Sequence, residues 1–253
     1  MNDLELAQEV AKQAGLLLMK VRDEHSELIN TRELGDIADK KSENLIAELI
    51  KTHRPDDAIL SEEALDDLNR LHTDRVWIVD PLDGTKEFST NREDFAVHIA
   101  LWERNSRFAP SNISTAVVGL PATGEILSTG VKKTLSKLTH APRVVISRTR
   151  PPETMSPMLD ALAKNFGGVE TIPLGSVGAK VAQLIQGQAD VYVHTTGFYE
   201  WDVAAPLAVA ASHGFHVSDI KNSPLLLNKE NTRVENLLIC HPDLTAVLLA
   251  VLK

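Results

Sequence analysis

The feature that most constrains this chain is an apolar run that ends in two carboxylates, Trp77-Ile78-Val79-Asp80-Pro81-Leu82-Asp83-Gly84-Thr85. The β-branched residues of the run favour a buried strand. Pro81 has no amide for a sheet ladder and Gly84 permits unusual turns, so we expect regular structure to stop at the first carboxylate. The two carboxylates and the Leu82 carbonyl form an all-oxygen ligand set that suits Mg²⁺. The amides of Gly84 and Thr85 could then face an anion.

Asp-Pro and Asp-Gly pairs are also common turn formers that need no metal, so this stretch alone leaves a plain turn open. Two other stretches favour a site. Ile59-Leu60-Ser61-Glu62-Glu63 is a second apolar run that ends in acids, and Glu200-Trp201-Asp202 opens an apolar helix far downstream. Acids at the apolar edges of three elements suggest one convergent site.

These stretches resemble, in order, the three signatures of the inositol monophosphatase superfamily, which contains lithium-sensitive, Mg²⁺-dependent phosphatases. The matching residues are Ser61-Glu62-Glu63, Asp80-Pro81-Leu82-Asp83-Gly84-Thr85 and Trp201-Asp202-Val203-Ala204-Ala205. The resemblance runs from about Leu4 to the C-terminus and is strongest to 3'(2'),5'-bisphosphate nucleotidases of the CysQ type. It implies an α+β fold, the layered αβαβα sandwich of the inositol monophosphatase and fructose-1,6-bisphosphatase type.

The resemblance also implies two to three bound Mg²⁺ ions. One would be held by Glu62, Asp80 and the Leu82 carbonyl. A second would be held by Asp80, Asp83 and Asp202, and a weaker third ion would lie near Glu62. Metal ions can neutralise a phosphate monoester and stabilise its leaving oxygen.

Asp39 lies near the start of a helix that we expect over residues 36–52. From its position alone it could be an acid favoured by the helix dipole. The superfamily has a Thr-x-x-Asp pattern here, and its Asp pairs with the Thr of the long signature. Asp36 replaces the first Thr in this chain. The resemblance implies that Thr85, hydrogen-bonded to Asp39, deprotonates the attacking water.

Gly175, Ser176 and Lys180 match a Gly-Ser-x-x-x-Lys stretch that lines the substrate pocket of the nucleotidases. A Gly-Ser pair at a helix start can equally be a simple cap. The spacing is not that of a nucleotide triphosphatase P-loop. Lys180 lies one helical turn after Ser176, so we expect both to face one pocket edge.

Ser147 and Arg148 begin a Ser-Arg-Thr-Arg stretch that resembles the Ser-Arg-Ser-His of the nucleotidases, with Arg150 in place of the His. A solvated basic turn is the alternative. His194 lies where inositol monophosphatases place a Glu that binds inositol hydroxyls, which argues against inositol phosphate as the preferred substrate. We therefore expect substrate contacts from Ser147, Arg148 and His194.

The implied activity is Mg²⁺-dependent hydrolysis of the 3'-phosphate of 3'-phosphoadenosine 5'-phosphate, and of its sulfated form, to AMP or adenosine 5'-phosphosulfate, in sulfate assimilation. The alternative enzyme is a broader phosphatase for inositol-1-phosphate or fructose-1,6-bisphosphate. The alternative from another class is a non-catalytic protein that binds metal and phosphate. A non-catalytic protein would be expected to lack one of the residues that deprotonate the attacking water, whereas Asp39 and Thr85 are both present.

Composition fits a cytoplasmic protein whose partner is a small phosphorylated substrate. The formal net charge is −9 over 253 residues, which argues against binding of nucleic acid polymers or anionic membranes. The single cysteine, Cys240, cannot form an internal disulfide. The N-terminus has no apolar signal core, and the final apolar run, Leu244 to Leu252, is too short to span a bilayer. A homodimer is a possible assembly.

Hydrophobic periodicity predicts two halves, an α+β half over residues 1–135 with most metal ligands and an α/β half over residues 136–253 with the substrate pocket and Asp202. Helices are expected over 4–21, 36–52, 64–71, 152–166, 177–186, 202–213 and 244–252. Strands are expected over 75–79, 96–102, 115–120, 125–129, 143–147, 170–173, 189–194 and 236–240. A loop is expected over 23–35, and the strands of the first half should form an antiparallel meander.

Overall fold

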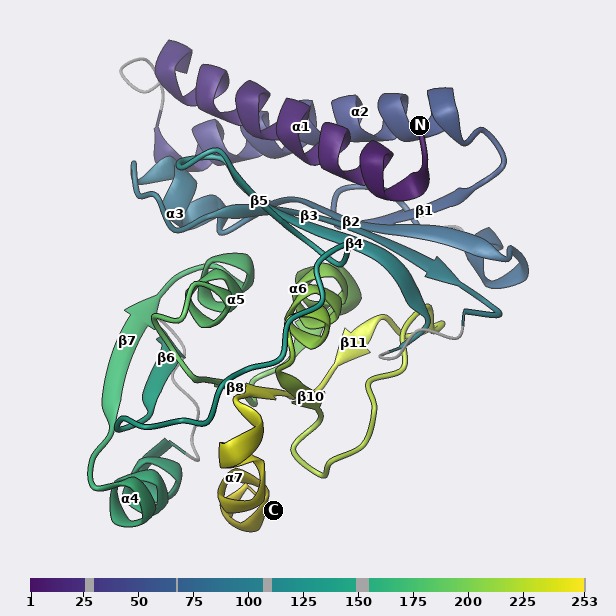
Figure 1. Ribbon diagram of the computed structural model, residues 1–253. Coiled ribbons are helices and arrows are strands. Elements are labelled where there is room, and N and C mark those ends of the chain that lie inside the picture. The colour runs from purple at the N-terminus through teal and green to yellow at the C-terminus, as the bar shows by residue number, and fades with distance from the viewer. Residues whose placement is uncertain (26–29, 67, 107–110, 149–154, 253) are drawn as a thin grey trace.

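The computed structural model describes residues 1–25, 30–66, 68–106, 111–148 and 155–252. Its outer layer consists of two long helices, α1 (Asp3–His25) and α2 (Thr31–His53), which lie side by side (Figure 1). The Asn30 side chain caps α2 by accepting a hydrogen bond from the Glu33 amide at 2.9 Å. The apolar faces of both helices bury against the first sheet.

The first sheet has the order β1-β2-β3-β4-β5. Its strands are β1 (Ala58–Ser61), β2 (Arg75–Asp83), β3 (Ala96–Glu103), β4 (Ile113–Leu120) and β5 (Glu125–Ser128). β1 pairs with β2 in parallel, and β2 to β5 form the antiparallel meander that we predicted. Helices cover both faces, which is why the central strands are apolar on both sides.

A middle layer of two helices, α5 (Val177–Ile185) and α6 (Glu200–Ser212), separates the two sheets (Figure 1). The largest core cluster lies here and joins residues of both sheets, for example Val76 and Val145. α6 is rich in Ala and Val and buried along most of its length, as expected of a helix packed between two sheets.

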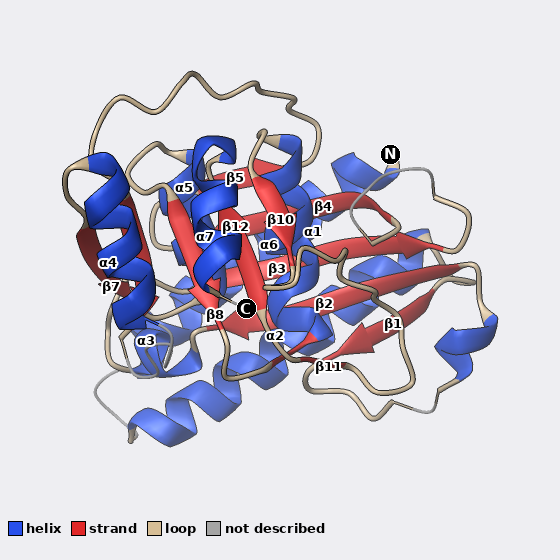
Figure 2. Ribbon diagram, turned by 90° about the horizontal axis from the view of Figure 1, so that it is seen from below, coloured by secondary structure: helices blue, strands red, loops and turns tan. Residues whose placement is uncertain are grey.

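The second sheet has the order β10-β12-β8-β6-β7. Its strands are β6 (Arg143–Ser147), β7 (Glu170–Leu174), β8 (Val191–His194), β10 (His216–Ser218) and β12 (Leu237–Cys240). The outer helices α4 (Met155–Phe166) and α7 (Thr245–Val251) cover its far face (Figures 1 and 2). The layers confirm the αβαβα sandwich.

Smaller elements complete the described chain: α3 (Thr85–Ser89), the 3-10 turns η1 (Asn69–His72) and η2 (Pro242–Leu244), and the β9–β11 ribbon (Phe198–Tyr199 with Arg233–Val234). The sequence patterns missed β9, β10 and β11, because strands of two or three residues carry too little periodicity.

Three local expectations were wrong. α1 continues to His25 and α2 begins at Thr31, so most of the expected loop is helical, and its residues 26–29 lie outside the described residues. The helix expected over 64–71 is only the short turn η1. β2 continues to Asp83, although Pro81 lies within it, because the strand is irregular at that point. The predicted helix residues 152–154 also lie outside the described part.

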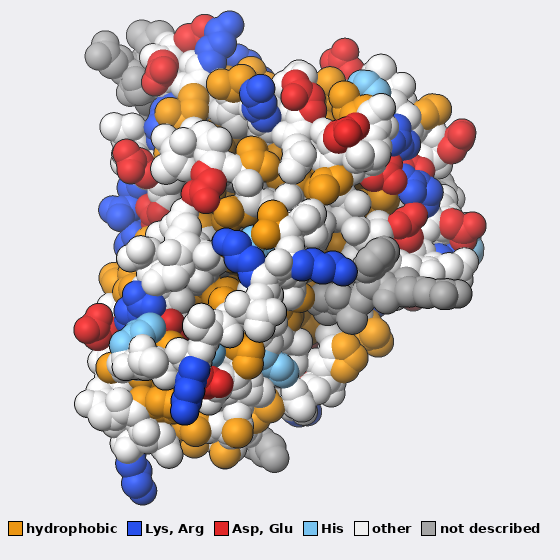
Figure 3. Space-filling view, in the orientation of Figure 1, with side chains coloured by type: hydrophobic (Ala, Val, Ile, Leu, Met, Phe, Trp, Pro, Cys, Tyr) orange, Lys and Arg blue, Asp and Glu red, His pale blue; other side chains and the backbone are white. Residues whose placement is uncertain are grey.

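The connection over residues 131–142 has no regular element and passes from the first sheet to the second. The division into halves near residue 135 stays a prediction. On the face seen in Figure 3, acidic and basic side chains of the described residues are interspersed. Within the described ranges, no helix combines the length and apolar character needed to cross a membrane.

Candidate active site

The end of β2 puts two aspartates on the same face of the sheet. Asp80 pairs with His98 and Asp83 pairs with Ala96, so a three-residue step on β2 opposes a two-residue step on β3. Side chains alternate along a regular strand, and residues three apart would point to opposite faces. The extra residue is a β-bulge, which returns both carboxylates to one face.

Polar contacts fix the backbone of this bulge. The Leu82 amide donates to Asp80 Oδ1 at 3.0 Å, and the Ser42 hydroxyl of α2 donates to the Pro81 carbonyl at 2.9 Å. The Leu82 carbonyl lies 3.2 Å from Thr85 Oγ1. Buried backbone groups are thus satisfied despite the broken ladder.

Asp83 lies against the start of α5. The Gly178 amide donates to Asp83 Oδ2 at 2.7 Å, and His98 Nε2 lies 3.2 Å from the same oxygen. Burial alone raises the pKa of Asp83, but His98, the Gly178 amide and Lys180 outweigh it and lower that pKa. A β-carbon at Gly178 would lie only 2.5 Å from His98 Nε2, so this close approach requires glycine.

Asp202 completes a compact acidic cluster. It is in the first turn of α6, where its Oδ2 accepts a hydrogen bond from the Tyr199 amide at 2.6 Å. One oxygen each of Asp80, Asp83 and Asp202 lies within 4.8 Å of the others, an arrangement that could hold a metal ion. Burial and then the charges of Glu62, Asp83 and Asp202 raise the pKa of Asp80 well above its ordinary value.

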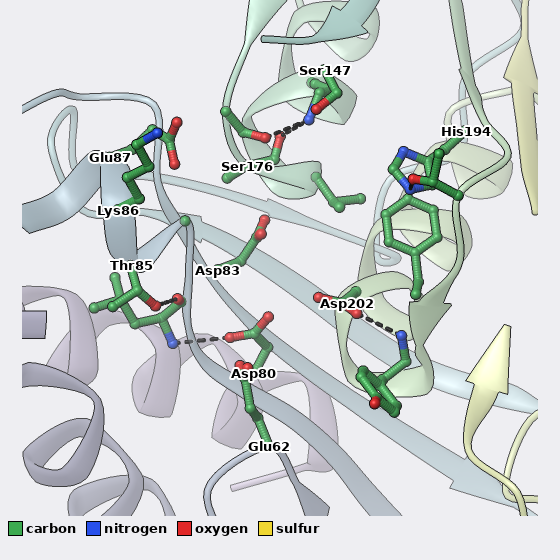
Figure 4. A pocket seen from close by; sticks show the side chains of 18 of the residues that line it. Glu62, Asp80, Asp83, Thr85, Lys86, Glu87, Ser147, Ser176, His194 and Asp202 are labelled. Carbon is green, nitrogen blue, oxygen red and sulfur yellow. Dashed lines mark hydrogen bonds between the residues drawn. The ribbon is translucent and has the colours of Figure 1, made fainter. Parts of the chain in front are cut away.

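Glu62 follows β1 and lies beside Asp80, on the same side of the pocket as the other acids (Figure 4). Although its side chain is largely exposed, partial burial of the carboxyl and the charges of Asp202 and Asp39 raise the pKa of Glu62 to about 8. Several carboxylates that raise one another's pKa values are poorly accommodated without cations. Their oxygens are the ligands that Mg²⁺ prefers, so the donor set fits this ion.

Thr85 lines the pocket and is hydrogen-bonded to Asp39 of α2 behind it. Thr85 Oγ1 donates to Asp39 Oδ2 at 3.0 Å. Asp39 lies well inside α2 rather than at its start, because the helix begins at Thr31. Burial raises the pKa of Asp39 to about 7, although the hydrogen bond from Thr85 lowers it. Gly35 permits this approach, since a β-carbon there would lie 2.6 Å from Thr85 Cγ2.

A pocket of about 450 Å³ unites most of the predicted site residues. Its lining includes Glu62, Asp80, Leu82, Asp83, Gly84, Thr85, Ser147, Gly175, Ser176, Lys180, His194 and Asp202. Asp39 lies behind Thr85 and does not line it. Figure 4 shows the carboxylates on one side and Ser147, Ser176 and His194 on the other.

The residues at the start of α5 form one wall. Ser176 caps the helix by accepting from the Ala179 amide at 2.9 Å. Lys180 is buried, with its ammonium group bonded to the carbonyls of Gly175 and Ser176 and 5.3 Å from the centre of the Tyr192 ring. The Gly-Ser pair is therefore both a helix cap and part of the pocket lining.

Arg148 differs from the residues at the start of α5, because it is held in ion pairs outside the pocket. Its guanidinium lies 3.1 Å from Glu87 Oε1 and 2.7 Å from Asp94 Oδ2, and it does not line the pocket. The two acids were not singled out from the sequence, and they hold the arginine against the α5 wall. Arg150 lies outside the described residues.

Sequence reasoning also missed His98, Arg233 and Tyr199. His98 contacts Asp83, and the other two line the pocket. A signal for His98 was available, because it is the one polar residue in the apolar stretch 96–102. No signal marked Arg233 or Tyr199, since their two-residue strands carry no pattern.

Residues 2–253 match the sequence model of the inositol monophosphatase family. The chain belongs to this family. The match covers almost the whole sequence, so the acidic cluster and the α5 wall both lie within the family region.

Curated family relatives are similar over most of their length. The chain is 38% identical to the 3'-phosphoadenosine 5'-phosphate phosphatase of Mycobacterium leprae, covering 100% of this chain and 94% of the relative. It is 41% identical to the protein of the same name from Mycobacterium tuberculosis, covering 93% and 88%. It is 32% identical to the 3'(2'),5'-bisphosphate nucleotidase CysQ of Escherichia coli, covering 86% and 90%.

Solved structures share the fold. The CysQ of Bacteroides thetaiotaomicron has a TM-score of 0.81 at 26% identity, covering 94% of this chain and 97% of that one. Inositol monophosphatase II of Staphylococcus aureus has a TM-score of 0.80 at 18% identity, covering 98% and 95%. The αβαβα arrangement is thus common to family members with different names.

Proposed function

We propose that this protein is a Mg²⁺-dependent phosphomonoesterase that removes the 3'-phosphate of 3'-phosphoadenosine 5'-phosphate, leaving AMP. The observation that carries the proposal is the convergence of Asp80, Asp83 and Asp202 in one pocket with Thr85, which is hydrogen-bonded to Asp39 behind it. The names of relatives at 38% and 41% identity support the substrate. The sulfated nucleotide would be cleaved in the same way, as in sulfate assimilation.

Two ions would be held by the residues expected from the sequence. Glu62, Asp80 and the Leu82 carbonyl would hold one, and Asp80, Asp83 and Asp202 would hold the other. A weaker third ion would lie near Glu62. When bound, Mg²⁺ would neutralise the substrate phosphate and the leaving oxygen. The compact cluster and the raised pKa of Asp80 support this assignment.

Thr85 and Asp39 would act as the base. Thr85 Oγ1 would accept a proton from the attacking water while passing its own proton to Asp39. An acceptor works best with a pKa near the working pH, and burial raises the pKa of Asp39 to about 7. Phosphoryl transfer would proceed in line without a covalent enzyme intermediate, and the amides of Gly84 and Thr85 would face the transferred phosphate.

The second phosphate of the substrate needs a cation beyond the metal side. Lys180 lines the pocket, but its ammonium group already bonds two carbonyls. Arg148 is paired with Glu87 and Asp94. Arg233 is better placed for this role, because it lines the pocket, its side chain is 49% exposed, and its ion pair with Glu235 is long at 3.9 Å.

The decisive experiment is phosphate release from a substrate panel with Mg²⁺ and with a chelator. We expect the highest kcat/KM for 3'-phosphoadenosine 5'-phosphate, and little release from inositol-1-phosphate or fructose-1,6-bisphosphate. Chelator should abolish turnover. Preference for a sugar phosphate would support the broader phosphatase instead. Binding of the nucleotide without any phosphate release would indicate a non-catalytic protein.

A further inference from the structure

Glu62 is carried by an exposed segment that follows β1. Residues 62–66 and 68 follow β1, are exposed and form no helix or strand before η1 begins at Asn69. Leu68 has a left-handed backbone, with φ of 62°. Within the described residues 62–70, only Arg70 is buried, at 2% exposure. This arginine is therefore the anchor of the segment on its C-terminal side.

The guanidinium of Arg70 joins two distant segments. It donates to Asp66, with Nη2 2.7 Å from Oδ2 and Nε 3.1 Å from both carboxylate oxygens. It also donates from Nη1 to Asn228 Oδ1 at 2.7 Å and from Nη2 to the Lys229 carbonyl at 2.8 Å. Only a planar fork of five N–H groups can satisfy all these acceptors together, so lysine cannot replace it.

Glu200 binds the backbone of the same two residues, Asn228 and Lys229. Its side chain is fully buried and accepts hydrogen bonds from the Asn228 amide at 2.6 Å and the Lys229 amide at 3.0 Å. Glu200 is the first residue of α6, two positions before Asp202. The turn at Asn228 and Lys229 thus connects Arg70 to the helix that carries Asp202.

Glu62 and Asp202 both line the pocket, at the other end of this connection (Figure 4). Asp80, Asp83 and Asp202 already form a compact group without Glu62, so Glu62 is the ligand whose position depends on a separate support. That support also has an N-terminal part, because the Ser61 hydroxyl bonds Glu43 of α2.

We propose that Arg70 is a positioning residue that holds Glu62 in the pocket with Asp202, so that the metal site is closed by a bridge through Asn228, Lys229 and Glu200. The inference rests on the proposed metal site. The segments that it joins lie near β1 and β11, at the same edge of the molecule (Figure 2). Loss of the bridge leaves the residues of the compact acidic group in place and frees Glu62 to move away from it.

Arg70→Lys tests the bridge, with Arg75→Lys as the matched control. Arg75 also makes several ion pairs, to Asp3, Asp57 and Glu103, but it lies at the far end of β2 from the pocket. The readout is the Mg²⁺-induced rise in unfolding temperature without substrate, because an ion that binds only the folded state stabilises it according to its dissociation constant. Steady-state activity at varied Mg²⁺ is the second readout.

We expect both variants to unfold at a lower temperature in chelator. Only Arg70→Lys should raise the Mg²⁺ concentration at half-maximal stabilisation, on the order of tenfold, with kcat at saturating Mg²⁺ little changed. Asp66→Asn, which removes the charge partner of Arg70, should shift the midpoint in the same direction. If Arg70→Lys does not fold, Asp66→Asn alone provides the test.

A double-mutant cycle with Glu62→Gln separates positioning from general destabilisation. In the Glu62→Gln background, Arg70→Lys should cause no further shift of the Mg²⁺ midpoint, because the ligand that it positions is already altered. Additive shifts, an unchanged midpoint in Arg70→Lys, or an equal shift in Arg75→Lys would overturn the inference and leave the proposed function intact. Absence of Mg²⁺ stabilisation in the wild type would instead overturn the proposed function, and this inference with it.

Discussion

Asp39 is the carboxyl group whose surroundings best match a base. It is buried in α2, its Oδ2 bonds Thr85, and its Oδ1 has no hydrogen-bond partner in the described part of the chain. A buried acid with one free oxygen is costly for stability alone. That cost is explained if the group accepts a proton during turnover.

Asp39→Asn should keep the size of the side chain and remove its ability to accept the proton. We expect kcat to fall on the order of 10²-fold or more, while Mg²⁺ stabilisation of the fold persists. Asp36→Asn is the control, because it is an exposed acid one turn earlier on the same helix. Steady-state kinetics and thermal unfolding measure both effects. An unchanged kcat would remove Asp39 from the relay, and lost metal binding would make it a ligand.

Arg233 should distinguish substrates that have a second phosphate from those that lack one. Its Nη2 lies so close to Gly197 that a β-carbon there would be 2.6 Å away, and both residues line the pocket. Arg233→Ala should raise KM for 3'-phosphoadenosine 5'-phosphate on the order of 10- to 100-fold, since a hydrogen bond to a charged group contributes about 1.5–3 kcal/mol. The value for inositol-1-phosphate should not change.

Arg104→Ala is the control for this change, because Arg104 is similarly exposed but pairs with Asp74 outside the pocket. The measurement is KM and kcat for both substrates in the two variants. An equal rise in KM for the two substrates would show that Arg233 does not recognise the second phosphate.

At the scale of elements, the approach of α3 to α2 is what brings Thr85 to Asp39. The contact depends on Gly35, which has no side chain at the crossing. Replacing a helical glycine by alanine normally stabilises an isolated helix by about 1 kcal/mol. Steric conflict with Thr85 should reverse that gain here.

Gly35→Ala is therefore predicted to lower kcat by displacing the Thr85 hydroxyl, with an unfolding temperature that is unchanged or lower. Gly15→Ala is the matched control in α1, because a β-carbon there would meet Pro121 at an ordinary 3.4 Å. We expect that variant to keep wild-type kinetics. Wild-type activity in Gly35→Ala would show that the α2–α3 contact is not needed for catalysis.

At the scale of the whole molecule, the acidic pocket makes stability depend on pH and metal. The pKa values of Asp39 and Glu62 are raised to about 7 and about 8, and that of Asp80 is also raised. Between the unfolded and folded pKa values, the folded protein binds more protons than the unfolded chain. The free energy of unfolding therefore falls as pH rises through this range.

In chelator, the unfolding temperature of the metal-free protein should fall as pH rises from 6.5 to 8. His213 and His216 have lowered pKa values and act in the opposite direction, but this effect fades as pH rises above the unfolded histidine pKa of about 6.5, so the carboxylates dominate the upper part of the window. Saturating Mg²⁺ should reduce the loss, because cations favour the ionised acids. Calorimetry across the window measures the slope, and Asp39→Asn should flatten it. A constant or rising unfolding temperature in chelator would contradict the prediction.

Much of this protein follows from local patterns in the sequence. Amphipathic spacing located the long helices, and the alternation of apolar strands and helices in the second half matched β6, α5 and α6 closely. The acids of the pocket were also identifiable, because Glu62, Asp80 and Asp202 each stand beside an apolar run. These features depend on neighbours in the chain, which is why the sequence alone was sufficient.

Other features depended on contacts between residues far apart in the chain, and only the tertiary structure decided them. The bulge turns Asp83 to the same face as Asp80 because β3 fixes the register. Arg148 is paired because α3 and Asp94 lie beside it. Arg70 reaches Lys229 across 159 positions of sequence. The physical reason is that a side chain's protonation and hydrogen bonds depend on the residues around it in space. The local pattern of the sequence does not identify those residues.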